Sequence, residues 1–326
     1  MTLDCGTAAL LARLEEMGGG STRDMGAVDA TTARVASRAM WAVFVGEERC
    51  AGCAKDFIIP GGAGPIPARL YRPLTLEPVQ TLRPLVVFLH GGGWAMGDLD
   101  SYEPLMQSLS TMSGSLFVSI DYRLAPEYKF PAGLEDGLAA VRWAATHAMK
   151  IGGDPARIAI MGDSSGGNLA AVIAHRLRHD ERVHLAAQFL LYPVLDVASP
   201  HDSFPSRLRF GDGAYLLTCR DLEVTTAWYL DGRTNAEDPA VSPLLAEDLA
   251  GIPPTVVLVA GHDPLQDEAR LYADRLVAAG VPTQFRCFET TIHAFLSFGA
   301  LDVARKGRAW LAERVSQHLA CSTQKS

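Results

Sequence analysis

The sequence predicts an α/β fold, with a mostly parallel central sheet and helices on both of its faces. Short, strongly apolar runs alternate with stretches of helical length from residue 85 onward. Parallel strands need long crossover connections, usually helices, and strands buried on both faces appear as continuous apolar runs. The length of 326 residues exceeds the ~250–300 residues of a single hydrophobic core. We therefore expect one large α/β domain with a smaller helical cap.

The elements are expected in the following order. Leucines on one helical face predict a first helix at 8–17, and a second helix is predicted at 30–45. A strand pair near 56–59 and 68–71 precedes the main sheet. The apolar runs predict strands at 85–89, 157–161, 189–192, 255–260 and 283–288, and the stretches between them predict helices at 101–113, 131–149, 166–180, 266–279 and 302–318.

A serine follows the predicted strand at 157–161. The run Gly162–Gly167 reads Gly-Asp-Ser-Ser-Gly-Gly, which contains the pattern Gly-x-Ser-x-Gly. A serine on so sharp a strand-to-helix turn needs glycines two residues away on either side, because a Cβ there would clash. The turn would lift the Ser164 hydroxyl to the carboxyl edge of the sheet. The pattern is short and glycine is frequent, with 30 in the chain, so chance is the alternative if it stands alone.

A second glycine-rich run follows the strand at 85–89. His90–Trp94 reads His-Gly-Gly-Gly-Trp. Consecutive glycines let the backbone approach an acyl carbonyl and direct N–H donors at the oxyanion that forms on it. We expect these donors from Gly92, Gly93 and Ser165. A phosphate-binding loop is the alternative, but neither the dinucleotide pattern nor the P-loop pattern occurs here.

A serine nucleophile needs a base, and the base needs an orienting acid. Asp263 follows the predicted strand at 255–260, and His293 follows the predicted strand at 283–288. Both would therefore lie at the same sheet edge as Ser164, in the chain order serine, acid, histidine. The other histidines are expected to be solvated or packed side chains.

A further motif lies at Asp121–Ala132, which reads Asp-Tyr-Arg-Leu-Ala-Pro-Glu-Tyr-Lys-Phe-Pro-Ala. Together with the blocks at 192–193, 242–244 and 263–265, the motifs resemble those of the hormone-sensitive lipase-like branch of the α/β-hydrolases. They occur in the same order as in that family, over roughly residues 55–320. The resemblance implies an α/β-hydrolase fold, a triad and an oxyanion hole at the positions named above. Two residues depart from the family pattern: Ser165 stands where alanine is usual, and Ala294 where glycine is frequent.

The expected activity is hydrolysis of carboxylic esters of small molecules through an acyl-enzyme, without a cofactor or metal. The resemblance implies short- to medium-chain acyl groups, because a cap would enclose the pocket. Trp41, Trp94 and Phe210 are candidates for the pocket wall, although packing of the cap onto the core is the alternative for each. Activity should fall in acid, because His293 must be neutral to accept a proton. An amidase or deacetylase is the nearest alternative, and a non-catalytic receptor of this fold would lack the histidine.

The domain boundaries follow from these assignments. We expect an N-terminal cap segment at 1–55, a catalytic domain at 56–196 and 241–326, and a cap insertion at 197–240. The insertion interrupts the strand–helix alternation and is rich in aromatic residues. It follows a central strand, which would place it above the carboxyl edge of the sheet.

Composition limits the partners. A net charge of −8 argues against nucleic acid and anionic membranes. No apolar run approaches the ~18–20 residues of a membrane span, and Met1–Cys5 lacks the start of a signal peptide, so a cytoplasmic enzyme is expected. Family analogy alone suggests a homodimer. Cys50 and Cys53 have Cys-x-x-Cys spacing but no second Cys or His pair for zinc, which favours free thiols, with a disulfide as the alternative.

Overall fold

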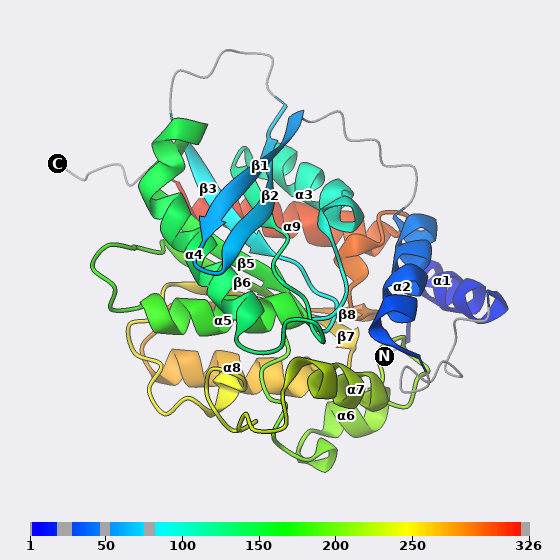
Figure 1. Ribbon diagram of the computed structural model, residues 1–326. Helices are drawn as coiled ribbons and strands as arrows, with labels where there is room; N and C mark the ends of the chain where they lie inside the picture. The colour runs from blue at the N-terminus through cyan, green and yellow to red at the C-terminus, as the bar shows by residue number, and fades with distance from the viewer. Residues whose placement is uncertain (1, 18–27, 46–52, 75–81, 321–326) are drawn as a thin grey trace.

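The computed structural model describes residues 2–17, 28–45, 53–74 and 82–320 (Figure 1). Within them, eight strands form one sheet in the order β1-β2-β4-β3-β5-β6-β7-β8. The strands are β1 (Cys53–Gly61), β2 (Gly64–Arg72), β3 (Arg83–Leu89), β4 (Leu116–Ile120), β5 (Gly153–Asp163), β6 (Ala187–Leu191), β7 (Thr255–His262) and β8 (Thr283–Ile292). The order confirms the predicted α/β fold, since β3 to β8 are parallel and β2 is antiparallel to both β1 and β4.

Helices cover both faces of the sheet (Figure 1). They are α1 (Cys5–Glu16), α2 (Ala30–Phe44), α3 (Leu99–Ser113), α4 (Ala132–His147), α5 (Ser165–Leu177), α6 (Pro205–Phe210), α7 (Cys219–Tyr229), α8 (Gln266–Ala278) and α9 (Asp302–His318). The helices α1, α2 and α3 each begin after an aspartate whose side chain accepts a hydrogen bond from the N–H group three residues later, at Asp4, Asp29 and Asp98. Such a cap satisfies a donor that the helix itself cannot, and typically contributes ~1 kcal/mol.

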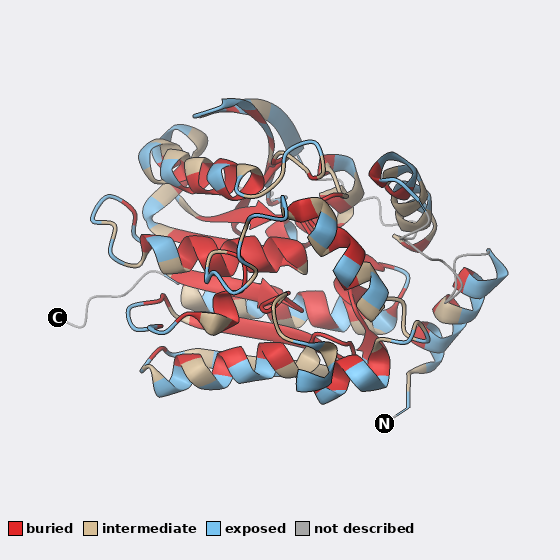
Figure 2. Ribbon diagram, turned by 60° about the horizontal axis from the view of Figure 1, so that its bottom comes forward, coloured by how far each residue is buried: buried red, intermediate tan, exposed pale blue. Residues whose placement is uncertain are grey.

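Two hydrophobic layers form the core, one on each face of the sheet. In β3, Leu85, Val87 and Leu89 pack with α4, α5 and α8, whereas Val86 and Phe88 pack with α3 and α9. This alternation follows from the two-residue period of a strand. Figure 2 shows the result, with buried strands between helices whose outward faces are exposed. The parallel strands are thus fixed in register, and their carboxyl ends meet at one edge.

Several strands are longer than predicted, and one strand is missing from the predicted set. The strand β4 is absent from the predicted set, although its sequence Leu-Phe-Val-Ser-Ile is buried throughout. The strand β8 continues to Ile292, four residues beyond the predicted end. His293 therefore follows its strand directly, so the rigid sheet reaches to the residue itself.

Candidate active site

Ser164 lies at the junction of β5 and α5. Its φ of 53° is in a region that non-glycine residues rarely adopt. An added Cβ at Gly162 would lie 2.1 Å from the Gly166 carbonyl oxygen, and one at Gly166 would lie 2.1 Å from the Leu89 carbonyl oxygen. Both glycines are therefore required by the turn, which is the geometry of a nucleophile elbow.

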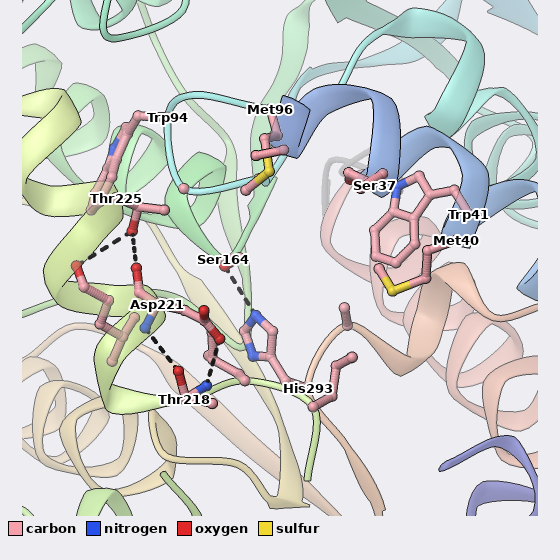
Figure 3. Close-up of a pocket in the computed structure, with 18 of the residues that line it drawn as sticks. Ser37, Met40, Trp41, Trp94, Met96, Ser164, Thr218, Asp221, Thr225 and His293 are labelled. Atoms are coloured by element: carbon pink, nitrogen blue, oxygen red, sulfur yellow. Dashed lines mark hydrogen bonds between the residues drawn. The ribbon is translucent and has the colours of Figure 1, made fainter. Parts of the chain in front are cut away.

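His293 connects Ser164 to Asp263. Its Nε2 lies 3.0 Å from Ser164 Oγ, and its Nδ1 lies 2.7 Å from Asp263 Oδ2. Figure 3 shows the imidazole directed at the serine from the end of β8. Asp263 follows β7, is fully buried, and accepts a second hydrogen bond from the Leu265 N–H group at 2.9 Å. The structure thus brings together three side chains that are separated by up to 129 residues.

The residue after His293 has a backbone conformation that favours glycine. Ala294 has a φ of 61°, in the left-handed region that favours glycine. Alanine tolerates this conformation at a cost of roughly 1–2 kcal/mol. The frequent glycine at this position is therefore explained by the backbone turn that presents the histidine.

The loop after β3 also depends on its glycines. Gly92 and Gly93 have φ values of 112° and 59°, and both line the cavity in front of Ser164. In the described part of the chain, neither N–H group donates to a backbone or side-chain acceptor. Ser165 begins α5, so its N–H group has no acceptor within the helix. The three expected oxyanion donors thus lie on the two backbone segments that flank the serine.

Asp163 is a site residue that the sequence did not reveal. Its Oδ1 accepts the Gly91 N–H group at 2.7 Å, and its Oδ2 accepts the Tyr102 hydroxyl at 2.9 Å. Burial raises the pKa of Asp163 to about 7, against the lowering effect of these hydrogen bonds. The hydrogen bond from the Gly91 N–H group connects the start of the glycine-rich loop to the nucleophile turn. The sequence signal for Asp163 was a charged residue at the end of an apolar strand. No local pattern in the sequence points to Tyr102 on α3.

A cavity of about 230 Å³ opens above Ser164 and His293. Figure 3 shows Met40 and Trp41 of α2 on one side of the imidazole, and Thr218 and Thr225 from the α7 region on the other. Most of the remaining wall is apolar, and it includes Met96, Val194, Leu216, Leu217 and Leu222. The cavity thus suits a largely apolar ligand with one polar group at the serine.

The three aromatic candidates for the wall have different positions. Trp41 and Trp94 line the cavity, and Trp94 stacks on Tyr229 with ring centroids 4.4 Å apart. Phe210 does not line it. Its ring packs instead against Tyr215 and His262, at 5.4 and 5.3 Å, because α6 lies beside the acid loop and not above the serine.

Other sequence expectations concern sites away from this cavity. Within the described residues, no group of three or more His, Cys, Asp or Glu side chains could hold a metal ion. None of the described helices is both long and apolar enough to span a bilayer. Cys53 is exposed at the start of β1, and Cys50 lies outside the described residues, so whether the two cysteines pair stays untested.

Known proteins resemble this chain along most of its length. A family model described as the α/β hydrolase fold matches residues 86–297. Esterase LipI of Mycobacterium tuberculosis is 39% identical over 81% of this chain and 82% of its own length, and an ethyl acetate hydrolase of Pseudomonas putida is 35% identical over 98% and 100%. Carboxylic ester hydrolase LipN of M. tuberculosis is 44% identical over 74% of this chain, which spans 64% of LipN.

A solved structure agrees with these relatives. An α/β hydrolase enzyme from the metagenome of Lake Arreo, Spain, solved as a Ser161Ala mutant, superposes with a TM-score of 0.91 at 33% identity and covers 98% of this chain and 99% of its own.

Proposed function

This chain belongs to the hormone-sensitive lipase-like branch of the α/β-hydrolases, and from that membership we propose that it hydrolyses carboxylic esters with Ser164, His293 and Asp263 as its triad. The supporting observation is His293, which lies within hydrogen-bond distance of both Ser164 Oγ and Asp263 Oδ2. A structural histidine would not need to connect a serine in a strained turn to a buried carboxylate.

The reaction follows from this geometry. As Ser164 Oγ attacks the ester carbonyl carbon, His293 Nε2 takes the hydroxyl proton. The negative charge that forms on the carbonyl oxygen is stabilised by the N–H groups of Gly92, Gly93 and Ser165. The C–O bond to the alcohol then breaks, and His293 returns the proton to the departing alkoxide. Water repeats these steps on the acyl-enzyme, which releases the acid and restores the serine.

The substrate class follows from the cavity. Met40 and Trp41 form an apolar wall on one side of His293, whereas the α7 side combines Leu217 and Leu222 with Thr218, Asp221 and Thr225. One part of the ester therefore contacts apolar side chains, and the other part contacts a mixed wall. The cavity volume of about 230 Å³ favours short- to medium-chain acyl groups over long lipids. The ethyl acetate hydrolase relative, named for a small ester, is consistent with this size.

We also propose the predicted division into a cap and a catalytic domain. The segments 1–55 and 197–240 each contribute a helix, α2 and α7, that lines the cavity. The cytoplasmic location and the homodimer stay predictions.

The deciding experiment compares the wild-type protein with Ser164→Ala on p-nitrophenyl esters from acetate to palmitate. We expect activity that peaks at short chains and falls by a factor of ~10⁶ in the variant, because the triad acts as a unit. Ser119→Ala is the matched control, since Ser119 is a buried serine in β4 outside the cavity. Equal activity of the Ser164 variant and the wild type would refute the assignment.

A further inference from the structure

The hydroxyl of Ser165 occupies a buried position between the nucleophile turn and the glycine-rich loop. The Ser165 Oγ lies 3.0 Å from the Trp94 backbone nitrogen and accepts that N–H group. The residue is fully buried and Trp94 is nearly so, which means that water does not supply this acceptor.

Trp94 needs this support because its backbone is strained. It has a φ of 57° and follows Gly92 and Gly93, which also have positive φ values. A non-glycine residue in this region is held there by its surroundings. Besides Ser165, its surroundings are the Ala125 N–H group, which donates to the Trp94 carbonyl at 2.9 Å, and the Tyr229 ring. Of these three, Ser165 alone belongs to the nucleophile turn.

Tyr122 contacts the other end of the loop. Its hydroxyl donates to the His90 carbonyl oxygen at 2.8 Å, and its ring stacks on the His90 ring with centroids 4.4 Å apart. The two ends of the loop are therefore held separately, Trp94 by Ser165 and His90 by Tyr122. Tyr122 belongs to the segment Asp121–Ala132, to which the proposed mechanism gives no role.

We propose that the Ser165 hydroxyl is a positioning group that fixes the Trp94 end of the oxyanion loop, His90–Trp94, relative to Ser164. The inference rests on the proposed function, because it assumes that Gly92 and Gly93 supply the oxyanion donors. Ser165 then has two separate roles. Its N–H group faces the oxyanion, and its side chain holds the glycine-rich loop on the other side of the oxyanion hole. Removing the oxygen leaves a buried N–H group unpaired and releases the strained loop.

The test is Ser165→Ala, compared with Ser119→Ala and Tyr122→Phe. Ser119 is equally buried, in β4, and in the described part of the chain its hydroxyl has no hydrogen-bond partner. With p-nitrophenyl acetate, we expect kcat of Ser165→Ala to fall by ~10- to 100-fold with KM within about twofold, since one oxyanion donor is worth ~10²–10³. Binding of a trifluoromethyl ketone, whose adduct places an oxyanion in the same site, should weaken by the same factor.

Three further readouts separate this role from a general loss of packing. The pH at which activity reaches half its maximum should not change, because the contacts of His293 are intact. The double variant with Tyr122→Phe should lose less than the product of the two single effects, because both side chains hold the same loop. Hydrogen exchange in peptides covering His90–Trp94 should be faster in Ser165→Ala and unchanged in Ser119→Ala.

The inference is overturned if Ser165→Ala matches Ser119→Ala in kcat and in loop exchange, or if kcat falls while affinity for the ketone is unchanged. Ser164→Ala is run beside these variants. If it keeps full activity, the proposed function fails, and the exchange measurement still decides whether Ser165 holds the loop.

Discussion

Backbone strain in this protein is concentrated at the candidate site. The described residues include five non-glycine residues with clearly positive φ: Trp94, Ser164, Tyr192, Leu216 and Ala294. Three belong to the nucleophile turn, the oxyanion loop and the histidine turn. Leu216 lines the cavity, and the Tyr192 ring packs edge-on against the His293 ring at 5.0 Å. Each such residue costs of order 1–3 kcal/mol, which the surrounding fold must offset. The strain thus marks the residues whose exact orientation the chemistry requires.

A comparison of Asp263 with Asp267 tests which aspartate is the acid of the triad. Asp263 contacts His293, whereas Asp267, four residues later, accepts the Ser206 N–H group of α6 at 2.7 Å. Asp263→Asn should lower kcat by ~10⁴, because an amide selects the wrong imidazole tautomer without changing the shape of the site. Asp267→Asn should leave kcat within a few-fold and reduce only the stability of the cap contact. Steady-state kinetics on p-nitrophenyl acetate measure both effects. Equal losses of kcat in the two variants would reject Asp263 as the acid.

At the level of elements, two arginines connect α2 to the rest of the fold: Arg38 pairs with Asp98, and Arg34 makes the larger set of hydrogen bonds. Arg34 donates to the carbonyl oxygens of Ala95 and Ala125, at 2.7 and 2.8 Å, and to both carboxylate oxygens of Glu127. Ala95 directly follows the oxyanion loop, so this side chain connects the cap helix to that loop. A bidentate pair of this kind needs the planar fork of arginine and is not reproduced by lysine.

This contact predicts a pH-dependent stability. The hydrogen bond from Arg34 lowers the pKa of Glu127 to about 2. Because the pKa is lower in the folded state than its ordinary value of 4.5, the stabilisation is present above that value and is lost as pH falls through about 2. Half of the Glu127 side chain is exposed, so solvent screening limits the effect to ~0.2–1 kcal/mol. Urea unfolding should show wild type more stable than Glu127→Gln at pH 7, with the gap closing from about pH 4.5 downward.

Glu135 supplies the control for this measurement. It has similar exposure and lies 4.0 Å from Arg123, without a bidentate contact. Glu135→Gln should therefore show little gap at any pH. A gap for Glu127→Gln that stays constant down to the lowest pH at which the protein is folded would contradict the ion pair.

The elements also show what the sequence could and could not predict. Ser164, Asp263 and His293 each follow a strongly apolar strand, so local patterns were enough to propose them. Asp163 and Tyr102 were missed because their hydrogen bond joins residues 61 apart on different elements. The strand β4 was missed because its five residues directly follow α3, with Gly114 and Ser115 as the only separation. The prediction that Phe210 lines the pocket was wrong, because composition places an aromatic residue in this segment without giving the direction of its side chain.

At the scale of the whole molecule, the insertion that carries α6 is anchored by a buried ion pair. Arg207 of α6 and Glu268 of α8 are both almost fully buried, and Glu268 also accepts the Leu195 N–H group at 2.7 Å. Breaking such a pair by removing one partner typically costs 3–5 kcal/mol, because the other charge stays buried. The insertion is therefore fixed to the same α8 that follows the acid loop, whereas α2 contacts the oxyanion loop. The helices α2 and α7 thus line the cavity beside Ser164 from opposite sides.

This arrangement predicts different roles for two aromatic residues of the cap. Trp41 on α2 lines the cavity and packs edge-on against Phe298 at 5.3 Å, so Trp41→Ala opens space next to Ser164. The ratio of kcat/KM for p-nitrophenyl hexanoate to that for the acetate should then rise several-fold, since each buried CH₂ contributes ~0.8 kcal/mol. Phe210→Ala should leave this ratio unchanged while lowering the free energy of unfolding by ~3–5 kcal/mol, because its ring packs in the base of the cap. Measuring both variants at a temperature where both are folded separates the two effects. If the ratio moved equally in both, the cavity wall would extend to α6, and the assignment of α2 as the wall that sets chain length would be wrong.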